Sequence, residues 1–269
     1  MILYKQNIFG QALFIKRFLI KFLGYVSWRR YGKFNKLQIE GSEIIRNIPE
    51  SGVLFISNHQ TYFADVAAML HVFNASLRGN VNDIRKPMKY LRKPKLNIYF
   101  VAATETMKKG LLPRLFAYGG AITVQRTWRK DGKNIKRDVQ MQDTDNIGKA
   151  LNEGWVISFP QGTVKPWMPI RKGTAHIIKN YKPVVIPIVI DGFRRSFDKK
   201  GLFIKKKGIL QSMIIKEPLK IDYENESIDE IVEKISYAIE QHPSFLESIP
   251  KETRVAMEEL NKKREFWEY

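Results

Sequence analysis

The sequence predicts an α/β fold, with a mixed central β-sheet flanked by helices, an N-terminal amphipathic helical segment and C-terminal helices. Three observations support this prediction. Short apolar runs of strand length recur along the chain, segments with helical periodicity separate them, and 269 residues with 44% hydrophobic content suffice for a full core. Strands that alternate with helices are typical of a sheet covered on both faces.

The elements follow from the position of these runs. The expected strands are residues 53–56, 96–104, 121–124, 155–159 and 184–190, the last of which should be the final strand of the core. Helices are expected from residue 64 and at 111–118, 142–152 and 172–180. The polar stretches 74–97 and 127–138 contain Gly or Pro, and we expect loops there, with a short helix in the first.

The C-terminal part has a different pattern. Ser227-Ile228-Asp229-Glu230 is a capping box, which predicts a helix that begins there and extends to about residue 241. A second, charged helix is expected from about residue 251 to the last residue.

Composition narrows the classes of function. The chain has no cysteine, which excludes disulfides, thiolate nucleophiles and thiolate-bound metals. Its histidines are His59, His71, His176 and His242, and no pair has the His-x-x-x-His spacing, so we expect no metal site. The net charge of +19 predicts a polyanionic partner: nucleic acid, an anionic bilayer, or a phosphorylated or acidic substrate.

The distribution of charge near the N-terminus favours a membrane. Residues 1–36 hold no acidic residue, and their cations are interleaved with apolar side chains that fall on one side of a helix: Ile8, Ala12, Ile15, Leu19, Phe22, Leu23 and Val26. Charges at Lys16, Arg17 and Lys21 leave the run too short to span a bilayer. We therefore expect a helix that lies in the interface of an anionic membrane. The alternative is a core helix with a solvated edge.

A histidine and a carboxylate stand close together after the first expected strand. His59 and Asp65 have the side chains of a general base and of the group that orients it, since a neutral imidazole can deprotonate a hydroxyl while a carboxylate stabilises the resulting imidazolium. A structural alternative is a buried histidine satisfied by Asn58 or Asp65.

Other polar residues follow later strands. Arg126 ends the run 120–126, and its forked donors suit an anionic oxygen cluster, although it could simply pair with a surface carboxylate. In the run 159–163, Gly162 permits close approach of a substrate, and Gln161 and Thr163 offer hydrogen bonds; a tight turn is the alternative. Ligands of open α/β sheets bind at the carboxyl ends of strands, where these residues lie.

Taken together and in this order, the residues of roughly 40–195 resemble the glycerolipid acyltransferase family that includes 1-acylglycerol-3-phosphate acyltransferase. That family carries an Asn-His block with an Asp downstream, a Gly-to-Arg block, a Phe-Pro-Glu-Gly-Thr-Arg block and a Val-Pro block. The resemblance implies direct acyl transfer from a thioester, acyl-CoA or acyl carrier protein, to a lysolipid hydroxyl. It implies no acyl-enzyme and no cofactor.

The resemblance also implies residue roles. His59 would deprotonate the acceptor hydroxyl, and Asp65 would orient His59. Pro160 and Pro187 would shape the site. The expected substrate-binding residues are Asn58, Arg126, Gln161, Gly162, Thr163, Lys165 and Lys172, the last in a Lys-Gly element that follows the third block in many members.

Three departures from the family pattern bear on these roles. Five residues separate His59 from Asp65, whereas the family has four, so the turn before the helix must absorb one residue. The Glu of the third block is Gln161 here, and the Arg after its Thr is Val164. Lys165, Arg171 or Lys172 could replace that Arg, and an acceptor with a carboxylate headgroup, such as an N-acyl amino acid, is the alternative to lysophosphatidate.

We expect three parts along the chain: a membrane-associating segment 1–36, an acyltransferase domain 37–222 and C-terminal helices 223–269. We expect a peripheral protein of the cytoplasmic face of a membrane, whose partners are the anionic membrane surface, the lysolipid and the acyl donor, and not nucleic acid. The competing classes are a non-catalytic lipid-binding protein of the same fold and a nucleic-acid-binding protein. The last rests only on net charge.

Overall fold

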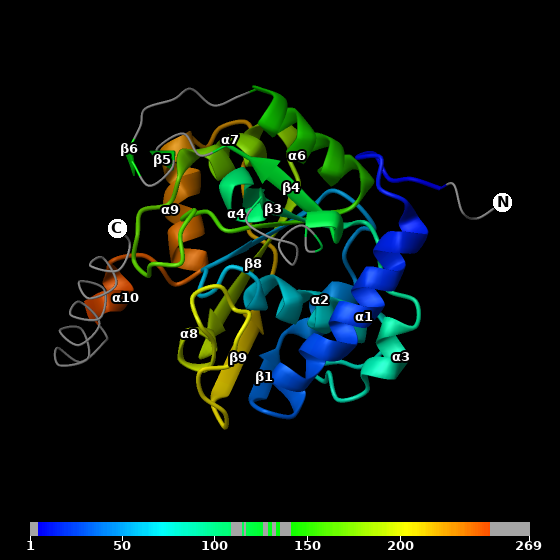
Figure 1. Cartoon of the computed structure of the whole chain (residues 1–269). Coiled ribbons are helices and arrows are strands. Elements are labelled where there is room, and N and C mark those ends of the chain that lie inside the picture. The colour runs from blue at the N-terminus through cyan, green and yellow to red at the C-terminus, as the bar shows by residue number, and fades with distance from the viewer. Residues whose placement is uncertain are drawn as a thin grey trace.

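A seven-stranded sheet with helices on both faces forms the centre of the molecule (Figure 1). The computed structural model describes residues 5–108, 115, 117–125, 129–130, 133–134 and 141–247. The strand order is β1-β9-β8-β2-β7-β3-β4. The strands are β1 (Lys36–Glu40), β2 (Val53–Ser57), β3 (Ile98–Ala103), β4 (Ala121–Val124), β7 (Trp155–Ser158), β8 (Val184–Asp191) and β9 (Leu210–Ile215).

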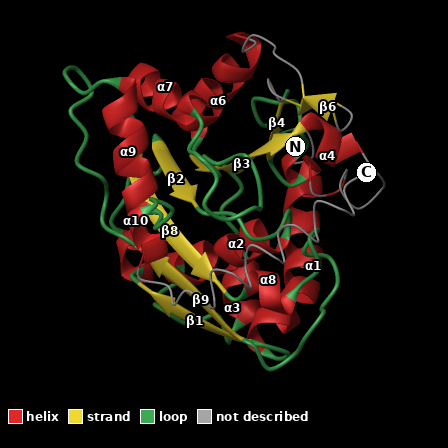
Figure 2. Ribbon diagram, turned by 90° about the vertical axis from the view of Figure 1, so that its left-hand side faces the viewer, coloured by secondary structure: helices red, strands yellow, loops and turns green. Residues whose placement is uncertain are grey.

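The helices fill the segments between these strands. On one face lie α1 (Leu13–Gly32), the 3-10 turn η1 (Ser42–Arg46), α2 (Ala64–Leu77) and α3 (Pro87–Leu91); on the other lie α6 (Met141–Glu153), α7 (Lys172–Tyr181) and α9 (Ile228–Ala238) (Figure 2). Three further helices are short: α4 (Thr104–Lys108), α8 (Phe193–Ser196) and α10 (Ser244–Glu247). This arrangement confirms the predicted α/β class.

The sheet is mixed, as predicted. Strands β8, β2, β7, β3 and β4 are parallel, whereas β9 pairs antiparallel to β8 and parallel to β1. The carboxyl ends of the five parallel strands therefore lie at one edge, where ligands bind in sheets of this kind. The expectation that residues 184–190 form the last core strand was wrong, because β9 follows and adds to the sheet.

Alternate residues of the central strands enter two separate cores. Along β2, Val53 and Phe55 pack toward the α1, α2 and α3 side, while Leu54 and Ile56 pack toward the α6, α7 and α9 side. All four are fully buried. A strand covered on both faces reads as a continuous apolar run, which is why the sequence predicted it correctly.

Some elements differ from the predictions. Within 127–138, expected to be a loop, Arg129–Lys130 and Lys133–Asn134 form the antiparallel pair β5 and β6. The capping box is confirmed, since Ser227 accepts from the Glu230 N–H and Glu230 accepts from that of Ser227. The helix expected after residue 251 and most of the one expected at 111–118 lie outside the described residues.

Helix α1 has one face against the protein and one exposed. Its inward residues include Lys16, Leu23, Ser27 and Tyr31, and Tyr31 donates to the Ala64 carbonyl oxygen over 2.7 Å. Its exposed apolar residues are Phe14, Ile15, Phe18, Phe22, Tyr25 and Val26. No helix among the described residues is long and apolar enough to cross a bilayer.

A buried histidine ties α1 to its neighbours. The His71 ring of α2 lies 2.9 Å from Ser27 Oγ of α1 through Nε2 and 3.0 Å from the Tyr90 hydroxyl of α3 through Nδ1. Burial lowers the pKa of His71 to about 3, so the ring is neutral at physiological pH. His71 is thus a packed residue, as expected, whereas His176 is exposed on α7.

Lys16 is an unusual residue for the inner face of α1. Its side chain is fully buried, and its ammonium lies 4.4 Å from the centre of the Tyr99 ring. Burial lowers the pKa of Lys16 from 10.5 to about 8, although the charge of Glu153 acts in the opposite direction. At neutral pH the helix is therefore docked at the cost of burying a charge.

Replacing Lys16 with Met should raise the free energy of unfolding. The lowered pKa corresponds to a destabilisation of about 3 kcal/mol, present below pH 8. Between about pH 8 and 10.5 the unfolded chain holds a proton that the folded chain has released, so wild-type stability rises with pH. The advantage of Lys16→Met, measured by urea unfolding, should thus be large at pH 7 and shrink at pH 10. Exposed Lys21→Met is the control, and an equal gain there would contradict the account.

Candidate active site

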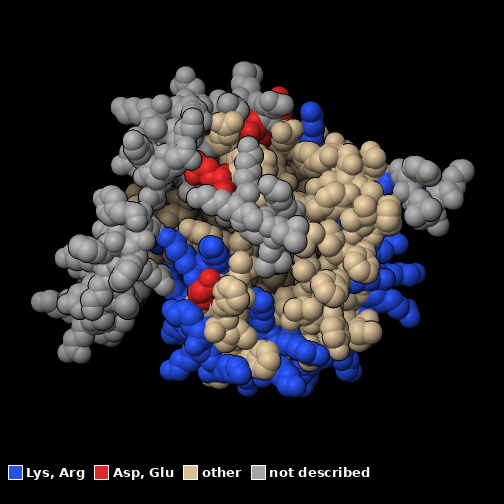
Figure 3. Space-filling model, in the orientation of Figure 1, with Lys and Arg blue, Asp and Glu red and all other residues tan. Residues whose placement is uncertain are grey.

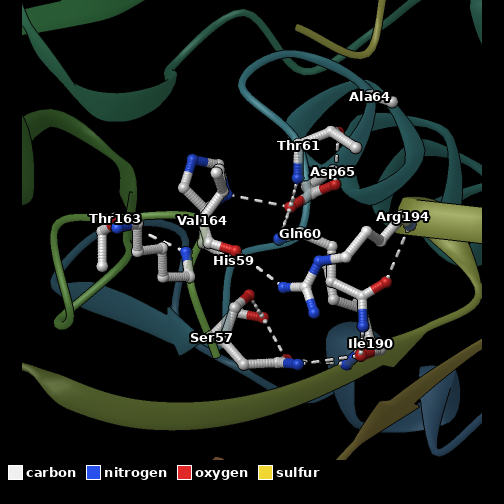
Figure 4. Close-up of polar contacts among 12 residues, drawn as sticks. Ser57, His59, Gln60, Thr61, Ala64, Asp65, Thr163, Val164, Ile190 and Arg194 are labelled. Atoms are coloured by element: carbon white, nitrogen blue, oxygen red, sulfur yellow. Dashed lines mark hydrogen bonds and ion pairs between the residues drawn. The ribbon is translucent and has the colours of Figure 1, made fainter. Parts of the chain in front are cut away.

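The His59–Asp65 turn connects the carboxyl end of β2 to the start of α2. His59 Nδ1 lies 2.8 Å from Asp65 Oδ2 (Figure 4). Asp65 is the second residue of α2 and is completely buried, while the His59 side chain is 13% exposed. The structure therefore brings the two residues together despite the additional residue between them.

The turn absorbs the additional residue by folding over the carboxylate. Asp65 Oδ2 accepts from the N–H groups of Gln60, at 2.6 Å, and Thr61, at 3.0 Å. Asp65 Oδ1 accepts from the Thr61 hydroxyl at 2.6 Å. With His59 included, four donors converge on one carboxylate at a helix N-terminus, which fixes its orientation.

The position of the imidazole follows from two contacts. With Nδ1 donating to Asp65 Oδ2, the lone pair of His59 lies on Nε2, on the side of the ring away from the carboxylate. The ring stacks on Phe159, with the two ring centres 3.8 Å apart and the planes 19° from parallel. The base is therefore held in one tautomer and one orientation.

His59 borders a mostly apolar cavity of about 110 Å³. Its walls come from the ends of β3 and β4, from α2 and α4, and from the residues after β7. They are formed by His59, Tyr62, Val66, Phe100, Val101, Ala102, Ala103, Met107, Val124, Phe159, Gly162 and Thr163. A general base beside an apolar cavity can deprotonate a hydroxyl away from bulk water.

The residues of the run 159–163 do not all face the cavity. Gly162, with φ of 65°, and Thr163 line the cavity, as their expected role requires. Gln161 does not line it and is 1% exposed; its Nε2 donates to Met168 O over 2.9 Å and to Gln241 Oε1 over 3.1 Å. The side chain turns inward and braces the loop, so it does not lie at the cavity, where its expected contact with substrate would be made.

Asn58 also differs from its expected role. Its Nδ2 donates to the Ile190 carbonyl oxygen, its Oδ1 accepts from the Ile190 N–H, both over 2.8 Å, and it is 7% exposed. Both the donor and the acceptor of the amide are therefore used to fasten the His59–Asp65 turn to β8. In this structure Asn58 holds the turn and does not line the cavity, where binding of substrate was expected.

Gln60 makes a second connection to β8. Its Nε2 donates to Ile190 O over 3.1 Å and to Asp191 Oδ1 over 3.2 Å. Burial acts to raise the pKa of Asp191, but the hydrogen bonds from Gln60 and Gly192 and the charge of Arg195 keep this pKa below its ordinary value. The charged carboxylate therefore helps to hold the turn.

The remaining expected residues lie outside the cavity wall or outside the described residues. Lys172 forms an exposed ion pair with Asp229 of α9, 2.7 Å long. Pro187 is buried within β8 opposite Ile56, so it supports the sheet below the turn and is not part of the described cavity lining. Arg126 lies outside the described residues.

Two other expected residues belong to the loop after β7. Pro160 is buried, and its carbonyl oxygen accepts from the Arg171 N–H over 2.9 Å. The Lys165 N–H donates to the Thr163 hydroxyl over 3.2 Å. These bonds fix the loop that carries the cavity residues Gly162 and Thr163.

Arg194 is a residue that sequence reasoning missed. Its backbone N–H donates to Gln60 Oε1 over 3.0 Å, and its Nη2 donates to the Val164 carbonyl oxygen over 2.6 Å (Figure 4). A guanidinium thus reaches position 164, where the family pattern has an arginine, from α8. No motif in the sequence pointed to Arg194, which lies thirty residues after Val164.

Comparisons with known proteins agree with this geometry. Residues 36–191, more than half of the chain, match the family described as Acyltransferase. The 1-acyl-sn-glycerophosphate (LPA) acyltransferase PlsC from Thermotoga maritima has a similar fold: the TM-score is 0.54, and the match covers 84% of this chain and 77% of that one at 18% identity. No curated protein sequence matches significantly. The family match and the ordered motifs together show that the chain belongs to the glycerolipid acyltransferase family.

Proposed function

We propose that this acyltransferase transfers a fatty acyl group from acyl-CoA or acyl carrier protein to the hydroxyl of 1-acylglycerol-3-phosphate. His59 Nε2 removes the hydroxyl proton as the oxygen attacks the thioester carbonyl, and Asp65 stabilises the imidazolium. Collapse of the tetrahedral intermediate breaks the carbon–sulfur bond, and His59 returns the proton to the leaving thiolate. The reaction uses no cofactor beyond the thioester.

One observation carries this proposal: the His59–Asp65 pair borders an apolar cavity with Nε2 on the side away from the carboxylate. A non-catalytic lipid-binding protein needs neither the 2.8 Å contact nor the three further donors on Asp65. A lyso-aminolipid acceptor is the second candidate, because Val164 and Gln161 remove two charges of the family pattern.

The two acceptors can be separated by one assay. Purified enzyme is incubated with acyl-CoA or acyl carrier protein and either lysophosphatidate or an N-acyl amino acid with a free hydroxyl. We expect faster ester formation with lysophosphatidate. A preference for the carboxylate acceptor would identify the second candidate, and transfer to neither would refute the proposal.

We further propose that the enzyme acts as a peripheral protein on the cytoplasmic face of a membrane. The support is the exposed apolar face of α1, where the Phe18 and Phe22 rings stack 6.2 Å apart and each follows an exposed cation in the sequence, Arg17 or Lys21. Exposed aromatic groups beside cations suit the interface of an anionic leaflet.

Replacing Phe18 and Phe22 with Ser should weaken binding to phosphatidylglycerol vesicles by about tenfold or more, because two largely exposed rings lose their burial in lipid. Vesicle sedimentation measures the change. The substitutions suit this test better than deletion of residues 1–30, since that deletion would remove the buried Lys16 and the contact of Ser27 with His71. Unchanged vesicle affinity, or tight binding of the wild-type chain to RNA, would contradict the proposal.

A further inference from the structure

The connection between α8 and β9 has a distinct composition. Residues 197–208, named here the lysine loop, contain Lys199, Lys200, Lys205, Lys206 and Lys207 but a single acidic residue, Asp198. Phe203 stands among them with 71% of its surface exposed. The loop follows the segment matched by the family, which ends at residue 191. Figure 1 places α8 and β9 in the lower part of the molecule, and Figure 3 shows Lys and Arg side chains gathered over that part.

The exposure of Phe203 is built into a hydrogen-bonded backbone. Asp198 Oδ1 accepts from the N–H groups of Leu202 and Phe203, both over 2.8 Å, and the Asp198 N–H donates to Phe203 O over 3.0 Å. Ser196 O accepts from the Lys205 N–H over 2.8 Å. The exposed ring of Phe203 therefore stands on a tip whose backbone is fixed by hydrogen bonds.

The lysine loop lies beside the exposed face of α1. Arg30 Nη1 donates to the Gly201 carbonyl oxygen over 3.1 Å. A groove of about 280 Å³ has Phe22 and Val26 on the α1 side and Gly201 and Leu202 on the loop side. The apolar face of α1 therefore continues across this groove to the loop that carries Phe203.

The loop also packs on the catalytic turn. The carbonyl oxygens of Lys199 and Lys200 accept from the N–H groups of Tyr62, at 3.1 Å, and Phe63, at 3.0 Å. Gly201 approaches so closely that a Cβ there would lie 2.6 Å from Ala64 N. The loop thus supports the part of the turn that absorbs the additional residue between His59 and Asp65.

We propose that the lysine loop is a second membrane contact, which binds anionic lipid headgroups through its lysines, inserts Phe203 into the interface and supports the catalytic turn at the bilayer. The effect on catalysis rests on the proposed acyl transfer, while the contact itself does not. An acidic carrier protein would also suit the lysines, but the outward Phe203 and the continuity with α1 favour a lipid surface.

Two loop variants and a matched control test the contact. Lys205→Glu/Lys206→Glu reverses two exposed charges whose side chains have no acidic partner among the described residues, and Phe203→Ser removes the apolar tip. Lys149→Glu/Lys220→Glu makes the same change of net charge at exposed positions on α6 and after β9. Binding is measured by sedimentation with vesicles containing phosphatidylglycerol, and thermal unfolding checks the fold.

We expect the loop charge variant to lose about 30-fold or more in affinity for anionic vesicles, and the control variant to lose less than about threefold. Phe203→Ser should weaken binding and reduce acyl transfer at vesicles more than transfer to a short-chain acceptor in solution. Equal losses in the loop and control variants would overturn the proposal. So would unchanged vesicle binding with weakened binding of acyl carrier protein. Vesicle binding tests the membrane contact even if the wild-type chain transfers no acyl group.

Discussion

His59→Ala should lower the rate of acyl transfer by about 10²- to 10⁴-fold, the range expected for loss of a general base. The reason is positional: in the described structure the imidazole borders the cavity, and its Nε2 lies on the side away from Asp65. The loss should fall on kcat, because the apolar cavity wall that binds substrate stays in place.

The substitution should leave the fold intact. His59 is partly exposed, and three further hydrogen bonds still hold Asp65 after the ring is removed. Thermal unfolding checks this point, and His176→Ala on the exposed face of α7 is the control for loss of an imidazole elsewhere. Wild-type activity in His59→Ala would refute the mechanism; equal loss in the His176 variant would assign the effect to something other than the base.

The sequence predicted the five parallel strands from β8 to β4 but not β1 and β9. Strands β2, β7 and β8 are continuous apolar runs because helices cover both of their faces. Strand β1 (Lys36–Glu40) has only Ile39 buried, and in β9 the buried residues alternate with less buried ones and include Gln211. Neither strand is therefore a continuous apolar run, which is the pattern that identified the buried strands.

Residue types indicated that His59 and Asp65 form a pair, but they did not indicate which groups the nearby polar side chains contact. His59 and Asp65 are close in sequence, and the turn alone can bring them together. Asn58 and Gln161 instead bond to Ile190 and Gln241, which are 132 and 80 residues away. Such partners depend on strand order and packing, and an amide side chain binds substrate or backbone equally well.

The hydrogen bonds that Asp65 accepts within the turn determine the expected effect of Asp65→Asn. In hydrolase triads the equivalent change costs about 10⁴-fold because the amide selects the wrong histidine tautomer. Here Asp65 Oδ2 accepts hydrogen bonds from the backbone N–H groups of Gln60 and Thr61 in addition to its contact with His59. An amide NH₂ placed there would face two donors, which would cost about 1–3 kcal/mol for each unpaired group.

The new amide should therefore keep its oxygen at the Oδ2 position and place its NH₂ toward the Thr61 hydroxyl, which can rotate to accept. His59 then retains its tautomer, and the variant loses only the negative charge that stabilises the imidazolium. We expect kcat to fall by about 10²-fold, less than in His59→Ala or Asp65→Ala.

Nitrogen NMR of His59 distinguishes the two explanations, because it reports which ring nitrogen carries the proton. An unchanged Nδ1–H tautomer with a moderate loss of rate would agree with the geometry of the turn. A switched tautomer with a loss near 10⁴-fold would mean that the backbone donors do not control the amide. No loss at all would mean that Asp65 orients the turn but contributes no charge to the reaction, and that the carboxylate's four donors serve the fold alone.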